Sequence, residues 1–450
     1  MTLIVGYKHM NLPRVMAVVA FSAIALSSCG NGLSAKAAET QPRKSGKTFA
    51  DWCRAQASLS PEAKHTVEVL LKQAGTTECD AANQTLSSLT ELDLDNNEIT
   101  DIKPLESLTK LTDLRLENNK INDIKPLESL SKLTVLVVKN NKISDIKPLE
   151  FLTNLTSLGL DGNTISDIKP LESLTKLTGI GLSENKISDI KPLESLTNLT
   201  GLDLSKNKIS DIKPLESLSK LTDLDLRNNL LGDIKPLKSL TNLSQIGLSD
   251  NSISDIKPLE SLTNLTRLHL SNNLLGDIKS VEFLTNLTEL LLSNNQINDI
   301  KPLESLTKLT GIFLSDNQIS DIKPLESLTN LTNLVLGKNQ ISDIKPLESL
   351  TKLTDLELNN NKISDITPLQ SLTNLDGLLL NNNQISDIKP LESLTKLTWL
   401  SLSSNQISEI KPLESLTNLI ELELSGNPIE PKTCPLQREL ACSWETPFVF

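Results

Sequence analysis

One pattern of apolar and polar residues recurs along most of the chain with a period of 22 residues. A representative copy is Leu199–Lys220, LTGLDLSKNKISDIKPLESLSK, and sixteen copies follow one another without insertion from Leu89 to beyond Leu419. Positions 1, 4, 6, 11, 14, 17 and 20 of the unit are almost always Leu or Ile, and position 9 is always Asn. A fixed period of this length predicts a solenoid in which each repeat forms one coil.

The spacing within the unit predicts the course of each coil. Leu202 and Leu204 alternate with polar or small residues, which is the period of two of a short, half-buried strand. Asn207 follows where the chain must turn, and its amide can satisfy turn backbone that would otherwise be buried without partners. Asp211 can cap a short helical turn, and Pro214 cannot extend a sheet. The seven aliphatic residues become buried only when coils stack, at roughly 4.8 Å per repeat.

The pattern LxxLxLxxN-x-I-x-D-I-x-P-L resembles the leucine-rich repeat in its 22-residue form. It is similar to the repeats of the internalin group of bacterial surface proteins and of the solenoid regulatory subunit of protein phosphatase 1. The resemblance covers Leu89 to about Ile429. It implies an α/β-type repeat solenoid, a right-handed horseshoe with a parallel β-sheet on the concave face and short 3₁₀-like turns on the convex face. It also implies that a partner binds on the concave face.

Both ends of such a solenoid need a cap, because a terminal coil otherwise exposes its aliphatic residues. Residues 49–88 are expected to form a helical N-terminal cap, with Ser60 as N-cap, Pro61 in the first turn and Gly75 after the last. Phe49 and Trp52 are expected to contribute to this lid. At the other end, residues 433–450 form the expected C-terminal cap, with aromatic cover from Trp444, Phe448 and Phe450.

The N-terminus has the features of a targeting segment, predicted as a signal peptide over residues 1–28. Lys8 and Arg14 precede an apolar run over residues 15–26, which is too short for a stable membrane span. The following Leu-Ser-Ser-Cys-Gly resembles the bacterial lipobox, in which Cys29 would become the lipidated first residue. Cleavage at 35–37 is the alternative, and Met10 is a second plausible start. Residues 29–48 are expected to be a flexible tether.

The five cysteines fit an exported protein. None lies inside the regular repeats, and one pair flanks each end of the array. In an oxidising compartment we expect the disulfides Cys53–Cys79 and Cys434–Cys442, which leaves Cys29 for the lipid. A metal site built from these cysteines is not expected, because the pairs sit at opposite ends of the solenoid. The expected location is therefore a membrane-anchored lipoprotein facing the periplasm or the cell exterior.

Composition and motifs argue against catalysis and against nucleic-acid binding. The formal net charge is −12, and the Lys column of the repeats runs beside Asp and Glu columns, so no nucleic-acid partner is expected. The chain has three His residues, and no GxSxG, HExxH or phosphate-binding glycine loop occurs. Recurring carboxylate pairs such as Asp355 and Glu357 are interpreted as solvated columns. No enzyme activity and no cofactor are predicted.

Information about function is expected where the repeat does not dictate the residue. These places are positions 3, 5 and 7, which alternate away from the core leucines, with position 8 beside them. Gly159, Gly179, Gly181 and Gly201 suggest a floor that another backbone could approach closely. The first two repeats carry a group of acidic residues that we call the acidic entrance: Glu91, Asp93, Asp95, Asp113 and Glu117. We interpret them as solvated carboxylates rather than as a Ca²⁺ site.

Further along, position 5 becomes apolar in repeats ten to fourteen, with Glu357 as the exception. Clustered apolar residues on an exposed face indicate an interface rather than ordinary strand propensity. We call this set, together with a neighbouring tryptophan and two basic residues, the candidate stripe: Arg267, His269, Leu291, Phe313, Val335, Leu379 and Trp399.

The sequence therefore predicts a non-enzymatic protein–protein interaction scaffold of the cell envelope, spanning repeats at residues 89–432. The partner would be a protein on the concave face, and contact with membrane would occur through a lipid anchor only. The alternative is a structural envelope spacer or self-associating array, which the near-identity of the copies keeps open. Changing the stripe discriminates the two, because a spacer would not respond.

Overall fold

The computed structural model describes residues 47–435 and 442–444, which divide into two compact units. The N-terminal unit comprises the described residues up to 187 together with 191–199, and the C-terminal unit comprises 188–190 and the described residues from 200 onward. The predicted signal peptide, Cys29, Phe448 and Phe450 lie outside the described residues.

The N-terminal unit begins with helices and continues with the first coils of the solenoid. Its helices are α1 (Phe49–Arg54), η1 (Gln56–Ser58), α2 (Pro61–Ala74) and α3 (Cys79–Leu86). Its strands are β1 (Glu91–Asp93), β2 (Asp113–Arg115), β3 (Val135–Val137), β4 (Ser157–Gly159) and β5 (Gly179–Gly181). Its later 3₁₀ helices are η2 (Lys103–Leu105), η3 (Lys125–Ser129), η4 (Lys147–Phe151), η5 (Lys169–Ser173) and η6 (Lys191–Ser195).

The C-terminal unit consists of coils of the same kind. Its strands are β6 (Gly201–Asp203), β7 (Asp223–Asp225), β8 (Gln245–Gly247), β9 (Arg267–His269), β10 (Glu289–Leu291), β11 (Gly311–Phe313), β12 (Asn333–Val335), β13 (Asp355–Glu357), β14 (Gly377–Leu379), β15 (Trp399–Ser401), β16 (Glu421–Glu423) and β17 (Cys442–Ser443). Its 3₁₀ helices are η7 (Lys213–Ser217), η8 (Lys235–Ser239), η9 (Lys257–Ser261), η10 (Lys279–Phe283), η11 (Lys301–Ser305), η12 (Lys323–Ser327), η13 (Lys345–Ser349), η14 (Thr367–Ser371), η15 (Lys389–Ser393) and η16 (Lys411–Ser415).

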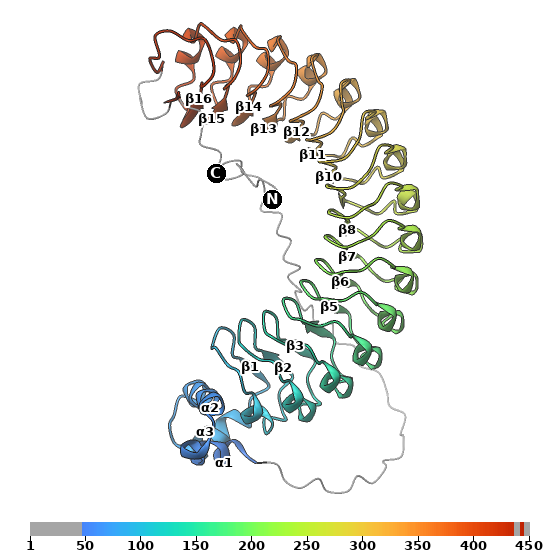
Figure 1. Ribbon diagram of the computed structural model, residues 1–450, viewed down its shortest axis with the longest axis vertical. Helices are drawn as coiled ribbons and strands as arrows, with labels where there is room; N and C mark the ends of the chain where they lie inside the picture. The colour runs from blue at the N-terminus through green and yellow to red at the C-terminus, as the bar shows by residue number, and fades with distance from the viewer. Residues whose placement is uncertain (1–46, 436–441, 445–450) are drawn as a thin grey trace. The chain divides into compact units, whose positions relative to one another are not determined.

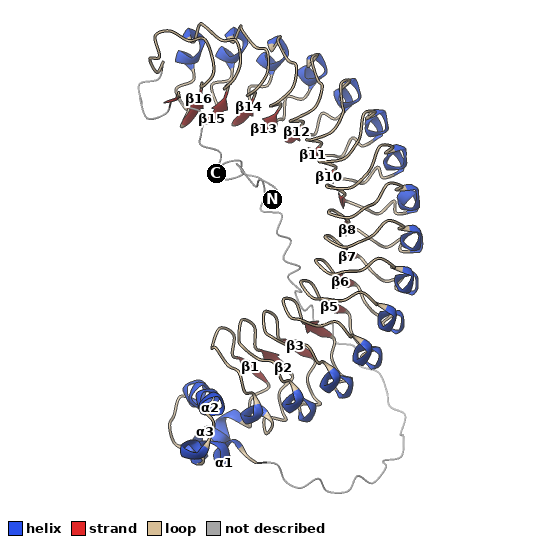
Figure 2. Ribbon diagram, in the orientation of Figure 1, coloured by secondary structure: helices blue, strands red, loops and turns tan. Residues whose placement is uncertain are grey.

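Within each unit the coils of β1 to β15 have the strand on the inner side and a 3₁₀ helix on the outer side (Figures 1 and 2). Neighbouring strands pair in parallel and in register with the 22-residue repeat, as in Leu290 opposite Ile312. This is the predicted leucine-rich-repeat architecture, with a parallel sheet on the concave face and 3₁₀ turns on the convex face.

The interior of each coil contains the predicted aliphatic column. In the coil that holds β12, the column is no more than 1% exposed at any position: Leu331, Leu334, Leu336, Ile341, Ile344, Leu347 and Leu350. Each fully buried side chain of this kind contributes about 1.5–3 kcal/mol to stability. Because each column extends into the next coil, the aliphatic contacts hold neighbouring coils together.

The Asn at position 9 connects three segments of backbone through one side chain. Asn339 donates from Nδ2 to the carbonyl oxygens of Leu314, Leu336 and Gly337 at 3.0, 3.0 and 3.2 Å. Its Oδ1 accepts from the Ile319 N–H at 3.0 Å. Leu314 and Ile319 belong to the preceding coil, so the amide satisfies the turn backbone, as predicted, and also joins adjacent coils.

Position 8 is constrained by the backbone, which the sequence interpretation did not foresee. Its non-glycine residues have φ between 52° and 59°, as in Asp316 and Lys338. This left-handed region is sparsely populated by residues other than Gly, Asn and Asp. The expectation that the repeat leaves position 8 free is therefore wrong, because the turn before Asn dictates its backbone conformation.

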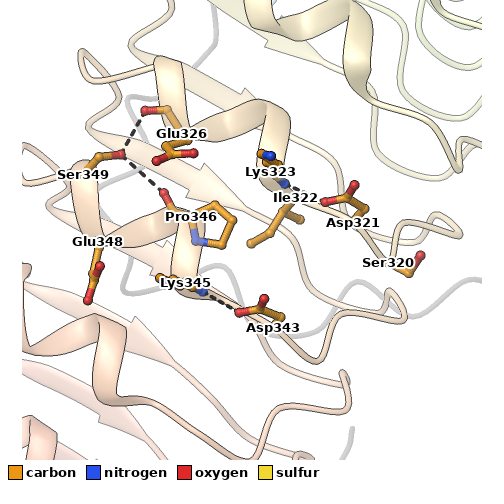
Figure 3. Close-up of a pocket in the computed structure, with 10 residues that line it drawn as sticks. All are labelled: Ser320, Asp321, Ile322, Lys323, Glu326, Asp343, Lys345, Pro346, Glu348 and Ser349. Atoms are coloured by element: carbon orange, nitrogen blue, oxygen red, sulfur yellow. Dashed lines mark hydrogen bonds between the residues drawn. The ribbon is translucent and has the colours of Figure 1, made fainter.

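The outer side of the coils has its own repeating hydrogen bonds. Asp343 accepts through Oδ1 from the Lys345 N–H at 2.8 Å (Figure 3). The N-cap of η13 is Ile344, so the Asp stands one position before the cap that the sequence predicted for it. Ser349 donates from Oγ to the carbonyl oxygens of Glu326 and Pro346 at 2.9 and 3.3 Å (Figure 3). Glu326 belongs to the preceding 3₁₀ helix, so this hydrogen bond joins adjacent coils on their outer side as well.

Helix α2 is attached to the first coils by polar contacts. Ser60 caps its N-terminus by accepting from the Ala63 N–H, and Gly75 ends it with φ of 68°. His65 Nε2 lies 2.7 Å from the Asn97 carbonyl oxygen, and Thr66 donates from Oγ1 to the Asp101 carbonyl oxygen at 2.7 Å. Both carbonyl groups follow β1, so α2 lies against the beginning of the solenoid.

Disulfides join the chain at both ends of the described array. Cys53 in α1 is bonded to Cys79 in α3, where Phe49 and Trp52 are buried. Near the other end Cys434 is bonded to Cys442. Strand β17, which contains Cys442, pairs in parallel with β16 and so extends the sheet beyond the last repeat.

Candidate partner-binding surface

The register of the strands brings the apolar residues at position 5 together on the concave face. Leu291 lies opposite Phe313, and Phe313 lies opposite Val335. Glu357 then separates Val335 from Leu379, because it is in register with both. Parallel strands are about 4.8 Å apart, so these residues form one row across β10–β14 (Figure 1).

Exposure differs along this row. Leu291, Phe313 and Leu379 are half-buried and retain accessible side-chain surface. Val335 is only 3% exposed, and its inclusion in the contact surface is therefore a prediction that the structure contradicts. Valine is shorter than the residues on either side of it, Phe313 and Glu357, and these neighbours leave it little access to solvent.

Trp399 lies on the strand after Leu379 but at position 3 instead of position 5. It is half-buried and in register with Gly377, which has no side chain to stand beside the indole. The structure therefore places Trp399 and Leu379 on adjacent strands of the same face. Phe313 lies further along the row, on β11.

The two basic residues of the candidate stripe differ in their surroundings. His269 Nε2 lies 2.9 Å from Glu289 Oε1 on the next strand, and the two side chains are only 12% and 18% exposed. The hydrogen bond from His269 holds the pKa of Glu289 below its usual value, against the opposing effect of burial. Arg267 is exposed and donates to Gln245 Oε1 at 3.1 Å. His269 is thus engaged within the protein, whereas Arg267 remains accessible.

Glu357 is the residue whose environment the sequence did not predict. It is only 7% exposed, and burial raises the pKa of its carboxyl group to about 7, with Asp316 adding to the increase and Lys338 opposing it. Asp355, two residues earlier, is half-buried, and burial raises its pKa as well. The interpretation of these two residues as a solvated column is therefore wrong, because neighbouring coils cover them.

The space into which Glu357 points is created by Gly337. A Cβ atom at Gly337 would lie 2.6 Å from Glu357 Oε1 and 2.3 Å from Asn359 Oδ1, so both oxygens occupy the place where a side chain would stand. Asn359 Oδ1 is buried and has no hydrogen-bond partner. Gly337 is the one glycine at position 7 of the sixteen repeats, and this was the sequence signal that could have located the cluster.

The predicted glycine floor does not form at Gly159 and Gly181. A Cβ atom at Gly159 would lie 2.7 Å from Lys139 Cε, and one at Gly181 would lie 2.3 Å from Asp161 Oδ2. Lys139 Nζ and Asp161 Oδ2 form an ion pair at 2.9 Å. The protein's own charged side chains therefore fill the space above Gly159 and Gly181, and a partner backbone has no room there.

The acidic entrance does not assemble into a cation site in the described part of the chain. Among those residues, no group of three or more His, Cys, Asp or Glu side chains is arranged to hold a metal ion. Asp95 accepts a hydrogen bond from the Glu117 N–H, and burial nevertheless raises its pKa above the ordinary value. Asp95 thus supports the backbone of the next coil.

The convex face carries shallow grooves that repeat with the coils. One, of about 710 Å³, lies between η12 and η13 and is shown in Figure 3. Grooves of about 610 and 560 Å³ occur between η10 and η11 and between η4 and η5. They are lined by corresponding Asp, Lys, Glu and Ser residues of the repeat. Grooves that recur in this way follow from the stacking of the repeat and do not single out one site.

The regular coils and their sequence identify the class of protein. The family profile described as leucine-rich repeats in two copies matches residues 87–195, 197–283, 285–371 and 395–434. The chain therefore belongs to the leucine-rich repeat family, whose members are in general protein–protein interaction scaffolds. No curated protein matches the chain in sequence.

Several bacterial proteins are among the solved structures that this chain resembles. An internalin of Listeria monocytogenes, InlF, is 35% identical with a TM-score of 0.64 and covers 79% of this chain and 98% of its own. A leucine-rich repeat protein of Leptospira interrogans is 32% identical with a TM-score of 0.72, covering 78% and 93%. The functional domain of Listeria monocytogenes InlJ, which includes a cysteine ladder, is 25% identical with a TM-score of 0.70, covering 84% and 82%. The chain is thus an internalin-like leucine-rich repeat protein, although its own cysteines lie outside the regular repeats.

No helix in the described ranges, 47–435 and 442–444, is both long enough and apolar enough to cross a membrane. The predicted lipid attachment at Cys29 falls outside these ranges.

Proposed function

We propose that this protein is a non-enzymatic binding scaffold that holds another protein on the concave face of its C-terminal unit. The observation that carries the proposal is the row across β10–β14, in which Leu291, Phe313 and Leu379 are half-buried apolar residues, with Trp399 on β15. Half-buried aromatic side chains supply much of the binding energy of interfaces when a partner removes their remaining surface from water. Arg267 would contribute at the rim, because it is exposed.

The site is revised relative to the candidate stripe. Val335 is left out of the contact residues because it is only 3% exposed. His269 is left out because its ring pairs with Glu289. The proposed contact residues are therefore Arg267, Leu291, Phe313, Leu379 and Trp399.

The test compares a double variant of the concave face with a matched double variant of the convex face. Phe313→Ser with Trp399→Ser removes the aromatic residues of the proposed surface. Phe151→Ser with Phe283→Ser removes two aromatic residues that are 54% and 48% exposed on η4 and η10. Both variants should retain the circular dichroism spectrum of the wild type.

The measurement is affinity capture from an envelope extract, followed by titration of the captured protein. The concave variant should lose the partner, and the convex variant should retain it. If a captured partner binds the concave variant with unchanged affinity, the binding surface lies elsewhere. If no partner is captured by the wild type under any condition, the structural spacer becomes the better description.

We further propose that the protein is exported and anchored through Cys29. The two disulfides support export, because such bonds persist in oxidising compartments. Replacement of Cys29 by Ala should leave an unprocessed or soluble protein without a diacylglycerol-labelled band. A wild-type mature N-terminus at Ala38 would show instead that the signal is cut at the alternative site.

A further inference from the structure

We propose that the cluster of Glu357, Asn359 and Gly337 is a receptor site for a basic side chain, Lys or Arg, of the protein partner. This inference rests on the proposed function, since it names the chemistry of a partner on the same face. It starts from two oxygen atoms that share one space. Glu357 Oε1 and Asn359 Oδ1 both lie above Gly337, in the space that a side chain at this position would otherwise take.

Both oxygens lack donors within the protein. Asn359 Oδ1 is buried without a hydrogen-bond partner. None of the described residues forms a hydrogen bond with the Glu357 carboxyl group, which is also more than nine-tenths buried. Buried acceptors without donors are rare in folded proteins, because leaving them unsatisfied is unfavourable. Asn359 Oδ1 is such an acceptor, and the Glu357 carboxyl group beside it also has no donor, so together they point to a ligand that carries several N–H groups.

The charges nearby favour a cation over a neutral donor. Lys338 is the base whose charge acts on Glu357, and its ammonium group lies 3.2 Å from Asp316 Oδ2, with which it pairs. Asp316 adds negative charge that acts on Glu357, and Asp355, two residues before Glu357 on β13, is itself acted on by the charge of Asp376. A lysine ammonium group has three N–H donors and an arginine guanidinium group has five, so either could serve both oxygens.

The walls of the site suit the stem of a long basic side chain. Glu357 stands in register between Val335 and Leu379, and Phe313 follows Val335 in the same row. Lys and Arg bury their methylene groups along apolar surface while the charged end reaches a polar group.

The protonation of Glu357 couples this site to pH. Because burial raises the pKa of Glu357 to about 7, a fraction of the free protein carries a proton there at neutral pH. A bound cation requires the carboxylate, so binding releases that proton to solvent. For a group of this kind, binding should weaken about tenfold between pH 8 and pH 6.

The experiment uses the full chain and a displayed library of random 12-residue peptides at pH 8. The wild type should enrich peptides that carry Lys or Arg next to an apolar residue. The best peptide should bind at least tenfold more weakly after Glu357→Gln, and its copy with acetyl-lysine or citrulline at the basic position should weaken equally. Glu348→Gln, which removes an exposed carboxyl group on the convex side, is the charge-matched control and should change nothing.

The outcomes separate this inference from the proposed function. If Phe313→Ser with Trp399→Ser abolishes peptide binding but Glu357→Gln does not, the concave surface binds and the basic-side-chain site is wrong. If neither variant affects binding, both are wrong. Enrichment without basic residues, or no enrichment, would also overturn the inference. Gln has nearly the same size as Glu and remains neutral, so the variant is expected to fold.

Discussion

The most direct test of what holds the coils together is the replacement of one position-9 asparagine by alanine. Asn339 is 9% exposed and makes four hydrogen bonds, three from Nδ2 and one to Oδ1. In Asn339→Ala the Ile319 N–H loses its acceptor, whereas the carbonyl oxygens of Leu314 and Leu336 keep a second donor, Asn317 Nδ2 and Asn361 Nδ2, each at 3.0 Å. The Gly337 carbonyl oxygen keeps another donor, the Asp316 N–H at 3.0 Å.

The magnitude follows from these groups. The buried Ile319 N–H is left without a partner, which costs about 1–3 kcal/mol, and each of the three carbonyl oxygens loses one of two hydrogen bonds at a smaller cost. We therefore expect a loss of roughly 2–4 kcal/mol in the free energy of unfolding. The control is Asn330→Ala on the outer side. Asn330 is exposed and donates to the Thr307 carbonyl oxygen at 3.0 Å, so its loss should cost less than about 1 kcal/mol.

The assay is urea unfolding followed by far-ultraviolet circular dichroism, with amide hydrogen exchange at Ile319 as a local readout. Asn339→Ala should lower the midpoint clearly more than Asn330→Ala and should remove the protection of the Ile319 amide. If the two variants differ by less than about 1 kcal/mol, or if the Ile319 amide stays protected, the ladder of asparagines is not what satisfies the turns.

Three further predictions follow from burial. Leu314→Ala should destabilise the protein by about 2–5 kcal/mol, because Leu314 is fully buried. Phe313→Ala should cost much less, because Phe313 faces the opposite side. Equal urea midpoints of the two variants would contradict this prediction. Burial raises the pKa of Glu357 from 4.5 to about 7, so the folded state binds more protons than the unfolded state and loses up to about 3 kcal/mol of stability as the pH rises from 4.5 to 7. Glu357→Gln should therefore be more stable than the wild type at pH 8 but not at pH 4. A difference in stability that stays constant across this pH range would refute the assignment. Reduction of the Cys53–Cys79 disulfide, which spans 26 residues, should lower the stability by about 3 kcal/mol and unfold the N-terminal helices before the repeats. Hydrogen exchange would show this as an early loss of protection in α2. Simultaneous loss of protection in the helices and the repeats would argue against an end cap.

Much of the fold could be predicted from the sequence, because the same pattern of residues recurs in each repeat and each coil therefore folds in the same way. The seven aliphatic positions and the Asn at position 9 perform the predicted roles, as Leu334 and Asn339 illustrate. A 22-residue period leaves one efficient way to bury these residues, which is to stack coils in register. Local pattern and global packing therefore agree.

The candidate surface could be predicted only in part. The sequence determined which residues stand on the concave face, since alternation with Leu at positions 4 and 6 decides the side of the strand. It did not determine which of them reach solvent. Phe313 retains surface while Val335, on the next strand, does not.

Only the tertiary structure decided the environment of the remaining residues, because it is set by residues of the neighbouring coils, 20 positions away in both of the following examples. Glu357 is buried between its neighbours and faces the space left by Gly337, and Gly159 is covered by Lys139 of the preceding coil. Position 8 adopts a left-handed backbone because the turn requires it, whichever residue occupies it. The sequence determines the period and the core, whereas contacts between coils determine which polar groups are covered, paired or left for a partner.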